Sequence, residues 1–496
     1  MPQMKKIHEP LTIFLIGVTG DLSKKKILKA IFKLFEKDLL SAPFTLVGNA
    51  RQPMSRAEFQ AFVKGVVKPE KAAVWEKFSE SLYYVAGDAS QAKTFDDIKA
   101  MHHQLTSESH CGNHMWYVAT LPKLYLSIVK NLKQFRLHST DCGWTKFMIE
   151  KPFGTDLATA QELNQELSSI FTEDQIFRID HTLGKETVQN LLAFRFANGL
   201  FEHLWNNKYI DHIQLVYAET LGIGGREQFY DETGALRDVV QNHILQIIAM
   251  TMMEEPASLD AKDIRHSRSE LLKNLSCVKK AGIAQNVHFG QYSAGEIYGD
   301  KVKSYRDEHA SLHDSETESA VALRLQVDND RWRDVPIYVR TGKRFAQDVL
   351  EIAIQFKDPK NSMFKDVPLG PEPNVLSFRF QPNEGIILKL FVKKPGHGIV
   401  LDQVPMSFCY HSLYQMGFIE AYERLIHDAS LGDPTLFPEA EAIEATWKII
   451  DELLEYKKQI KPELYPAGSW GPKSFDELIE RDGRKWIEPD MNACKL

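Results

Sequence analysis

Residues 11–26, LTIFLIGVTGDLSKKK, join an uninterrupted apolar run to a glycine turn and then to a lysine-rich segment. The run at 11–17 is typical of a strand that is buried on both faces of a parallel sheet. After the turn, apolar residues recur at helical spacing, at Ile27, Ala30, Ile31, Leu34 and Phe35. Strand, glycine turn and helix in this order are the setting of a dinucleotide phosphate loop. The stretch therefore predicts an N-terminal α/β domain of the Rossmann type that binds a dinucleotide.

The two glycines of this turn have separate tasks in such a loop. Gly17 permits the tight turn, and Gly20 lets backbone N–H groups approach a pyrophosphate at the helix N-terminus. The predicted loop consists of Gly17, Val18, Thr19, Gly20, Asp21, Leu22, Ser23 and Lys24. Because Thr19 and Leu22 break the usual GxGxxG pattern, a plain strand–turn–helix remains the alternative on this stretch alone.

The end of the next predicted strand, FTLVGNAR at 44–51, indicates which dinucleotide binds. NAD enzymes tend to place an acidic residue there, where it bonds the ribose 2′-hydroxyl. This chain has Arg51 instead, and an arginine can pair with a 2′-phosphate. The pattern predicts NADP as the cofactor, with a solvated surface charge as the alternative interpretation of Arg51.

Two further strands of the same sheet are predicted, LYYVAGDAS at 82–90 and MWYVAT at 115–120. Strand ends at one edge of a doubly wound sheet face the ligand crevice, so we expect Asp88 and Ala89 to contact the adenosine side of the cofactor. After TKFMIEKPFG at 145–154 the pattern changes. We interpret Lys151-Pro152 as a rigid join, and its peptide bond can be cis at little cost.

Beyond residue 180 the pattern indicates a different architecture. Long helices are expected at 186–199, 235–254, 410–428 and 440–458. The strands expected among them are DHIQLVYAE (211–219), AVALRLQV (320–327), VPIYVRTG (335–342), LEIAIQF (350–356), VLSFRFQP (375–382) and GIILKLFV (385–392). Successive strands with short turns predict an α+β domain with one large, mainly antiparallel sheet and helices on one face. We therefore expect an NADP-binding domain at 1–180 and a substrate-binding and dimerisation domain at 181–496, with a homodimer or a dimer of dimers formed through the sheet.

The bulk properties of the chain are consistent with this division. At 496 residues it is too long for one ordinary hydrophobic core. A composition of 43% hydrophobic and 26% charged residues, with a net charge of −7, argues against nucleic-acid or membrane-surface partners. The five cysteines show neither metal-ligand spacing nor the pattern of a disulfide framework. The most apolar later run, ILQIIAMTMM, has ten residues where a membrane span needs about 20, so no span is expected. The cysteine pattern fits a reducing compartment, and we therefore expect a cytoplasmic protein.

The segment LRDVVQNHILQII at 236–248 places a histidine on the apolar face of a helix. The residues of that face are Leu236, Val239, Val240, His243 and Ile247. A lone buried histidine is most often a satisfied core residue, but Asp238 lies close by, and RIDHTLGKE at 178–186 adds Asp180 and His181. A neutral imidazole that is oriented by a carboxylate can act as a general base near neutral pH. Beside an NADP site, such a base predicts the oxidation of an alcohol.

Six motifs occur in the order and spacing of the glucose-6-phosphate dehydrogenase family. They are GVTGDL (17–22), NARQ (49–52), EKPFG (150–154), RIDHTLGKE (178–186), QNH (241–243) and RTGK (340–343). The resemblance runs nearly end to end, through AYERLIHDASLGD (421–433) to AGSWGP (467–472), and RIDH-x-LGKE is its most specific part. It implies oxidation of β-D-glucose 6-phosphate to 6-phosphoglucono-δ-lactone with reduction of NADP, the first step of the oxidative pentose phosphate pathway, and it implies no metal.

The resemblance also implies a role for each matching residue. His243 would be the proton acceptor, and Asp180 would be the carboxylate that orients it. The implied substrate residues are His181 and Lys185 at the 6-phosphate and nearby hydroxyls, Glu219, Asp238 and Lys343 at the sugar, and Lys151 between substrate and nicotinamide. The implied cofactor residues are those of the loop at 17–24, together with Arg51 and Lys151.

The chain departs from the family pattern at two positions, both on the substrate-phosphate side. Thr182 stands where the family has tyrosine, and Asp348 stands where many members have a second basic residue, so substrate affinity is expected to differ. Two rival functions fit part of the sequence. Another NADP-linked, two-domain sugar dehydrogenase would use the lysine of EKP as its acid–base group, but RIDHTLGKE and His243 argue against it. A non-catalytic NADP-binding sensor would be expected to have lost His243 or Asp180.

Overall fold

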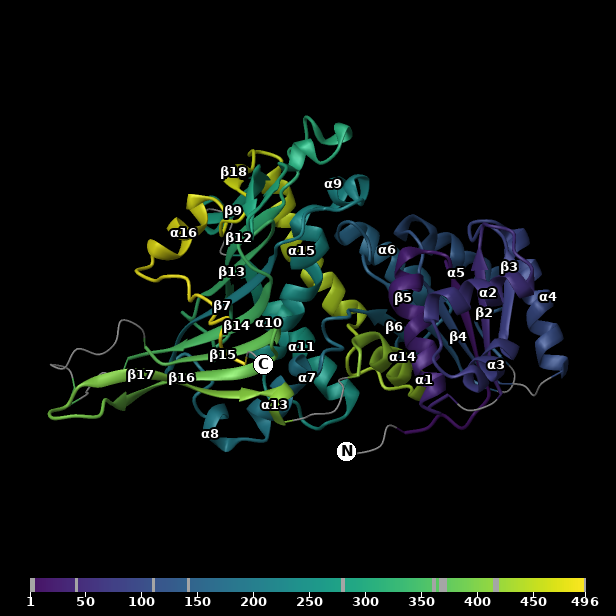
Figure 1. Cartoon of the computed structure of the whole chain (residues 1–496), viewed down its shortest axis with the longest axis horizontal. Coiled ribbons are helices and arrows are strands. Elements are labelled where there is room, and N and C mark those ends of the chain that lie inside the picture. Colours follow the sequence, from purple (N-terminus) through teal and green to yellow (C-terminus); the bar gives the residue numbers. More distant parts are fainter. Residues whose placement is uncertain are drawn as a thin grey trace. The chain divides into compact units, whose positions relative to one another are not determined.

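The computed structural model describes residues 5–40, 43–108, 112–140, 143–277, 282–358, 363–364, 373–413 and 419–494, and Figure 1 labels its elements. These residues form two compact units. Unit 1 comprises Met1–Gly184, Pro256–His266 and Ile419–Glu444, and unit 2 comprises Lys185–Glu255, Ser267–Phe418 and Ala445–Leu496. The first segment of unit 1 thus ends four residues after residue 180, and the unit also includes two segments from much later in the chain. The functional division of the chain at residues 180 and 181 stays a prediction.

Unit 1 is built on a six-stranded parallel sheet with the strand order β3-β2-β1-β4-β5-β6. Its strands are β1 (Leu11–Ile16), β2 (Phe44–Ala50), β3 (Leu82–Ala86), β4 (Asn113–Val118), β5 (Thr145–Glu150) and β6 (Ile176–Ile179). The order reverses between β1 and β4, and ligands of such sheets bind at this switch point, beyond the carboxyl ends of the strands. The predicted Rossmann-type fold of the N-terminal part is confirmed.

Helices connect these strands and cover the sheet. They are η1 (Ser23–Ile27), α1 (Leu28–Glu36), α2 (Arg56–Val67), α3 (Ala72–Glu80), α4 (Ala92–Glu108), η2 (Pro122–Leu124), α5 (Tyr125–Gln134), α6 (Leu157–Ser168), η3 (Glu173–Gln175) and α14 (Ala421–Leu431). Ser55 and Asp156 start α2 and α6 with capping boxes. α14 comes from the far end of the chain and packs on α1, where the buried Glu423 carboxylate pairs with Lys33 and Lys37 at 3.2 and 2.5 Å.

Unit 2 is built on a large mixed sheet that is mostly antiparallel, as the sequence predicted. Its main path runs β17-β16-β15-β14-β7-β13-β12-β9-β18, and β8 pairs with β12 beside this path. The strands are β7 (Ile210–Glu219), β8 (Leu275–Cys277), β9 (Val287–Ser293), β12 (Ala320–Val327), β13 (Ile337–Lys343), β14 (Val349–Phe356), β15 (Val375–Gln381), β16 (Gly385–Lys393), β17 (Leu401–Cys409) and β18 (Glu463–Pro466). β10 (Gly295–Ile297) and β11 (Asp300–Val302) form a separate two-stranded sheet. The pairs β7–β13 and β9–β18 are parallel.

The helices of unit 2 are α7 (Glu186–Phe196), α8 (Gly199–Glu202), α9 (Glu227–Ala235), η4 (Leu236–Ile244), α10 (Leu245–Met252), α12 (Ile283–Asn286), η6 (Tyr305–Asp307), η7 (Ala310–Leu312), α13 (Tyr410–Leu413) and α16 (Lys473–Glu480). α11 (Ala261–Asn274) and α15 (Ala440–Lys457) contribute residues to both units. The prediction of one helix at 410–428 is wrong. α13 ends at Leu413, and α14 begins only at Ala421 because Glu420 has an extended backbone; residues 414–418 lie outside the described residues.

The two faces of the unit 2 sheet are covered differently. Figure 1 shows α10 and α15 along one face and α16 on the opposite face. The C-terminal segment also crosses that opposite face: Gln214 of β7 donates to Lys485 O and accepts the Ile487 N–H, both at 2.8 Å. The sequence predicted helices on one face only, but the second face is also covered over its centre. β16 and β17 remain half-exposed, as a long hairpin that Figure 1 shows in light green.

A disulfide joins Cys409, at the end of β17, to Cys494. The cysteine spacing gave no indication of this bridge, because 85 positions separate the two residues. Among the described residues, no helix is both long enough and apolar enough to cross a membrane.

Candidate active site

Gly17 shapes the loop that follows β1. Its φ of +90° lies in the left-handed region, and a Cβ there would stand 2.4 Å from the Ala119 carbonyl oxygen, just beyond β4. The N–H groups of Gly17 and Val18 donate to Asn49 O at 2.9 and 3.0 Å, and Gly17 O accepts the Gly20 N–H at 3.0 Å. Only glycine fits this conformation and this close approach. The loop backbone therefore passes directly over the switch point between β1 and β4, where a dinucleotide phosphate would lie.

Arg51, Asp88 and Ala89 follow the ends of β2 and β3. Arg51 is exposed, one residue beyond β2, and Ala89 is buried. The Asp88 carboxylate accepts the backbone N–H and the hydroxyl of Ser90 at 2.8 and 2.7 Å. These bonds, with a smaller contribution from the Arg51 charge, keep the pKa of Asp88 below its usual value. The predicted cofactor residues thus gather at the carboxyl edge of three neighbouring strands.

Lys151, Asp180 and His181 stand beyond the ends of β5 and β6, also in unit 1. The Lys151–Pro152 peptide bond is cis, which the sequence allowed. Asp180 is 1% exposed, and its Oδ1 accepts the Thr182 N–H at 2.9 Å. The His181 ring stacks on the Tyr422 ring of α14, with 6.2 Å between centroids and 11° between planes. The parallel sheet therefore places these three residues at the same edge as the Gly17 loop.

A second set of predicted residues lies in unit 2, where β7 and β13 run parallel and end together. Their last residues, Glu219 and Lys343, are register partners, and Lys343 Nζ donates to Glu219 Oε2 at 2.7 Å. The same ammonium lies 5.2 Å from the ring centroid of Tyr230. Burial, and then the charge of Asp238, raises the pKa of the Tyr230 hydroxyl well above its usual value. The structure thus brings Glu219, Asp238 and Lys343 together around one tyrosine ring.

His243 lies on η4, a nine-residue helix of the wide π type that leads into α10. It is 2% exposed, as its place on the apolar stripe predicted. Asn242 stabilises the wide turn, because its side chain donates to Arg237 O at 3.1 Å and accepts the His243 N–H at 2.7 Å. The buried Glu318 carboxylate fixes the start of the helix by accepting the Leu236 N–H at 3.2 Å. Such wide turns are frequent at functional sites.

Lys185 stands immediately before α7 in unit 2. Its Nζ donates to the Gln381 side chain at the end of β15. Its charge also acts on Glu384, whose pKa is raised by burial and lowered in part by Lys185. Lys185 and His243 belong to unit 2, whereas Asp180 and His181 belong to unit 1, so the pairing of Asp180 with His243 stays a prediction.

Comparisons with known proteins match almost the whole chain. Residues 14–190 match the family model for the NAD binding domain of glucose-6-phosphate dehydrogenase, and residues 192–487 match the model for its C-terminal domain. The chain belongs to the glucose-6-phosphate dehydrogenase family. It is therefore an oxidoreductase, and unit 1 carries the family's domain for a nicotinamide cofactor.

Individual relatives in this family match over similar lengths. Glucose-6-phosphate 1-dehydrogenase 2 of Mycobacterium tuberculosis is 40% identical over 98% of this chain and 96% of its own length. Glucose-6-phosphate 1-dehydrogenase of Bacillus subtilis is 38% identical over 97% of this chain and 99% of its own. A solved glucose-6-phosphate dehydrogenase in complex with its substrate glucose 6-phosphate has a TM-score of 0.88 at 33% identity, with 98% of this chain and 100% of that chain covered.

Both departures from the glucose-6-phosphate dehydrogenase pattern have a structural counterpart. The Thr182 side chain is 1% exposed, and among the described residues its hydroxyl has no hydrogen-bond partner. Asp348 precedes β14, and its carboxylate accepts the N–H and the hydroxyl of Thr220 at 2.7 and 2.6 Å. Since Thr220 follows Glu219, Asp348 ties the end of β7 to the neighbouring strand β14.

Two residues beside the predicted site were not singled out from the sequence. Glu150, the last residue of β5, is buried and accepts the Tyr117 hydroxyl proton in a hydrogen bond of 2.7 Å. Tyr422 carries the His181 stack. Glu150 lies in EKPFG and Tyr422 lies in AYERL, two motifs that the chain shares with the glucose-6-phosphate dehydrogenase family. These shared motifs were the sequence signal that could have identified both residues.

Proposed function

We propose that the protein oxidises β-D-glucose 6-phosphate to 6-phosphoglucono-δ-lactone in the cytoplasm, with NADP as the hydride acceptor. This is the first step of the oxidative pentose phosphate pathway. The observation that carries the proposal is the end-to-end match to a solved family member in complex with glucose 6-phosphate. The buried histidine of η4 and the charged strand ends of β7 and β13 supply groups suited to this reaction.

In this reaction His243 takes the proton of the C1 hydroxyl as the hydrogen on C1 leaves as hydride. A neutral imidazole suits that task near pH 7, and a carboxylate next to it holds the ring and stabilises the imidazolium that forms. We assign that carboxylate to Asp180. The Thr182 N–H holds one oxygen of the Asp180 carboxylate at 2.9 Å, which restricts the orientation of this side chain.

The remaining charged groups are assigned to the substrate. His181 and Lys185 hold the 6-phosphate and nearby hydroxyls through charge-assisted hydrogen bonds. Glu219, Asp238 and Lys343 bind sugar hydroxyls. The ion pair between Glu219 and Lys343 supports this role, because it presents an acceptor and a donor side by side at one strand edge.

The cofactor residues fit a dinucleotide with a 2′-phosphate. The N–H groups of Gly17, Val18 and Gly20 hold the turn itself. The close approach of Gly17 to Ala119 keeps side-chain atoms away from this turn, so a phosphate can approach the backbone of the loop at 17–24. Arg51 is assigned to the 2′-phosphate, Asp88 and Ala89 to the adenosine side, and Lys151 to the space between substrate and nicotinamide. NADP, when bound, supplies the electrophilic carbon that accepts the hydride.

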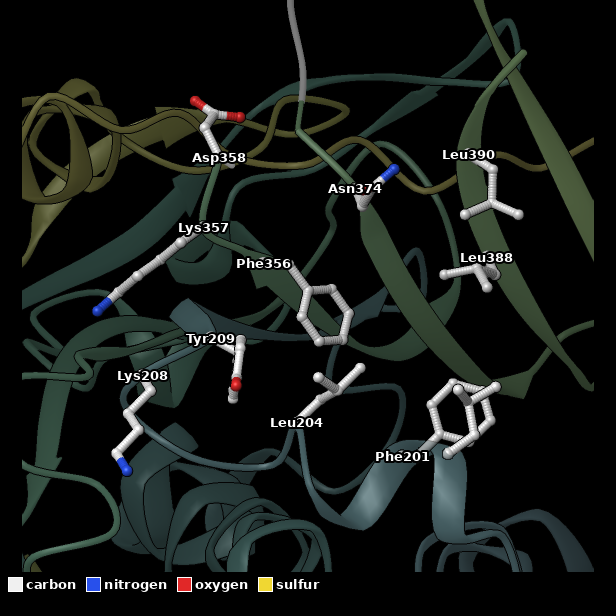
Figure 2. Close-up of a pocket in the computed structure, with 11 residues that line it drawn as sticks. Phe201, Leu204, Lys208, Tyr209, Phe356, Lys357, Asp358, Asn374, Leu388 and Leu390 are labelled. Carbon is white, nitrogen blue, oxygen red and sulfur yellow. The ribbon is translucent and has the colours of Figure 1, made fainter. Parts of the chain in front are cut away.

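We also propose that two copies associate through the β15–β17 part of the unit 2 sheet, as a homodimer or as a dimer of dimers. A hollow of about 590 Å³ lies there. Figure 2 shows the apolar side chains of Phe201, Leu204, Phe356 and Leu388 turned into it. A second hollow shares Phe201 and Leu388 and continues to β17. Contiguous exposed apolar surface often marks a site of protein–protein contact. Sedimentation equilibrium is expected to give at least the mass of a dimer, and a stable monomer would contradict this proposal.

The function is tested by following the absorbance of reduced cofactor after mixing the protein with glucose 6-phosphate and NADP. We expect steady reduction that needs the 6-phosphate, since glucose alone lacks the group that His181 and Lys185 hold. His243→Asn should lose about 10²–10⁴-fold in kcat, and His266→Asn, at an exposed position outside the site, should lose nothing. NADP binding without reduction would favour the non-catalytic sensor. Reduction with other sugar substrates only would favour another sugar dehydrogenase.

A further inference from the structure

Glu150 is a buried carboxylate at the end of β5. Its side chain is 6% exposed. Tyr117, on the neighbouring strand β4, donates its hydroxyl to Glu150 Oε1 at 2.7 Å, and Tyr125 of α5 donates to the Glu150 backbone oxygen at 2.9 Å. Two tyrosines from two elements therefore hold this one residue in place.

The groups that face Glu150 come from every element around it. Tyr117 and Tyr125 lie on β4 and α5, and Lys151 is the next residue in the chain. Asp180 follows β6, whose Ile179 is the register partner of Glu150. Tyr422 of α14 completes the set, and both Glu150 and Asp180 act on the pKa of its hydroxyl, which burial chiefly raises.

Burial gives this carboxyl unusual acid–base behaviour. It raises the pKa of Glu150 to about 7, while the Tyr117 hydrogen bond and the Lys151 charge oppose the shift and the Asp180 charge adds to it. Near neutral pH the group therefore takes up or releases a proton. A glutamine would accept the same Tyr117 hydrogen bond without the cost of burying a charge. A purely structural role therefore does not explain why this position carries a carboxylic acid.

We propose that Glu150 is a positioning residue that places a second negative charge behind Asp180 and thereby strengthens the base that Asp180 orients. This inference rests on the proposed function, in which the imidazolium formed at His243 is stabilised by Asp180. An ionised Glu150 favours that positive charge, and a protonated Glu150 does not. The catalytic power of the base consequently increases as Glu150 loses its proton.

Glu150→Gln is the first test, read as the pH profiles of kcat and of kcat/KM for glucose 6-phosphate. Without the second charge His243 becomes a weaker base, so the acid limb should move to lower pH by roughly half a unit to one unit. The alkaline plateau should fall by about three- to tenfold. A loss by the same factor at every pH would mark a purely structural role, and an unchanged profile would equally overturn the proposal.

Tyr117→Phe is the matched variant, because it keeps Glu150 and removes a hydrogen bond that favours the ionised form. Glu150 should then lose its proton at higher pH. The variant should resemble Glu150→Gln near pH 7 and regain the unaltered plateau at alkaline pH. Combined with Glu150→Gln, it should add nothing to the profile, and a further shift in the double variant would contradict the proposal.

Infrared difference spectroscopy between acidic and alkaline samples gives a readout that does not depend on activity. We expect a protonated-carboxyl band that disappears near pH 7 in the unaltered enzyme, that is absent from Glu150→Gln and that disappears at higher pH in Tyr117→Phe. A band insensitive to both variants would overturn the inference. Full activity of His243→Asn would instead overturn the proposed function, and the inference with it, so the two failures are distinguishable.

Discussion

Arg51 lies one residue beyond β2, exposed to solvent and in the place where NAD enzymes tend to carry an acid. A charge-assisted contact to phosphate contributes about 1.5–3 kcal/mol, and 1.4 kcal/mol corresponds to tenfold. Arg51→Ala should therefore raise KM for NADP more than tenfold and leave the kinetics with NAD nearly unchanged. Arg51→Lys keeps the positive charge but loses the planar guanidinium. Its KM for NADP should therefore lie between those of the unaltered enzyme and of Arg51→Ala. Equal losses with both cofactors would make Arg51 a structural residue.

Thr182 has a buried hydroxyl with no partner among the described residues. Replacing an unsatisfied buried hydroxyl by a methyl group of the same shape is close to neutral or stabilising. Thr182→Val should therefore leave KM for glucose 6-phosphate within about twofold and should not lower the melting temperature. A rise in KM at unchanged kcat would show instead that this hydroxyl reaches the substrate phosphate. Steady-state kinetics with saturating NADP, together with calorimetry, distinguish these results.

Glu150 also has a consequence for stability. Its pKa in the folded protein, about 7, lies above its usual value of 4.5, so the folded state holds this proton more tightly than the unfolded state. The stability that comes from this group is present below pH 4.5 and is lost as the pH rises to 7. The loss is at most roughly 3 kcal/mol. Calorimetry should find Glu150→Gln more stable than the unaltered protein at pH 8 and about equal to it at pH 4.5. A lower melting temperature at pH 8 would contradict the burial argument.

Individual residues show where sequence reasoning ended. The inward position of His243 was predictable, because helical spacing alone places it on the apolar stripe. The effect of Asp348 on substrate affinity stays a prediction, but no sequence pattern indicated that its carboxylate accepts two hydrogen bonds from Thr220, a residue 128 positions earlier. The disulfide between Cys409 and Cys494 also joins two residues that are far apart in the sequence. Such pairings depend on which strand ends and segments come together in space, and local patterns do not contain that information.

At the scale of elements, period-two and helical patterns placed several longer segments well, but they missed β9 and β17, with seven and nine residues, and the helices α4 and α11. The strand expected at 320–327 coincides with β12, and the helix expected at 440–458 ends one residue earlier, as α15. Short strands were missed, because β8 and β18 have three and four residues and owe their conformation to pairing with β12 and β9. The helix expected at 235–254 is divided into η4 and α10, since the Asn242 side chain takes the His243 N–H.

The loop between β1 and η1 supports a prediction of its own. Gly17→Ala would place a Cβ 2.4 Å from a backbone oxygen at a φ of +90°, so the loop must distort. We expect a lower melting temperature and a higher KM for the cofactor, with a strain of about 1–3 kcal/mol from the backbone alone. Gly65→Ala is the matched control, because α2 has open space there, and it should stabilise the protein by about 0.5–1 kcal/mol. Normal cofactor binding by Gly17→Ala would show that this turn does not bind the cofactor phosphate.

At the scale of the whole molecule, the order of the chain and the order in space differ. Residues 419–444 return to unit 1, where α14 packs on α1 and Tyr422 meets His181, more than two hundred positions away. A domain boundary drawn at one point of the sequence cannot express this return. The returning segment also carries the Glu423 carboxylate that two lysines of α1 contact, so unit 1 depends on residues synthesised long after its sheet.

The proposed base combines two residues that lie far apart in the sequence, Asp180 and His243. Asp180→Asn and His243→Asn should each lower kcat, by up to about 10²–10⁴-fold for His243. Residues that act as one unit give losses far from additive, so the double variant should be no slower than the slower single variant by more than a small factor. Asp88→Asn combined with His243→Asn is the control, and there the two effects should multiply. If the losses of Asp180→Asn and His243→Asn also multiply, the carboxylate and the imidazole act on different steps, and Asp180 does not orient the base.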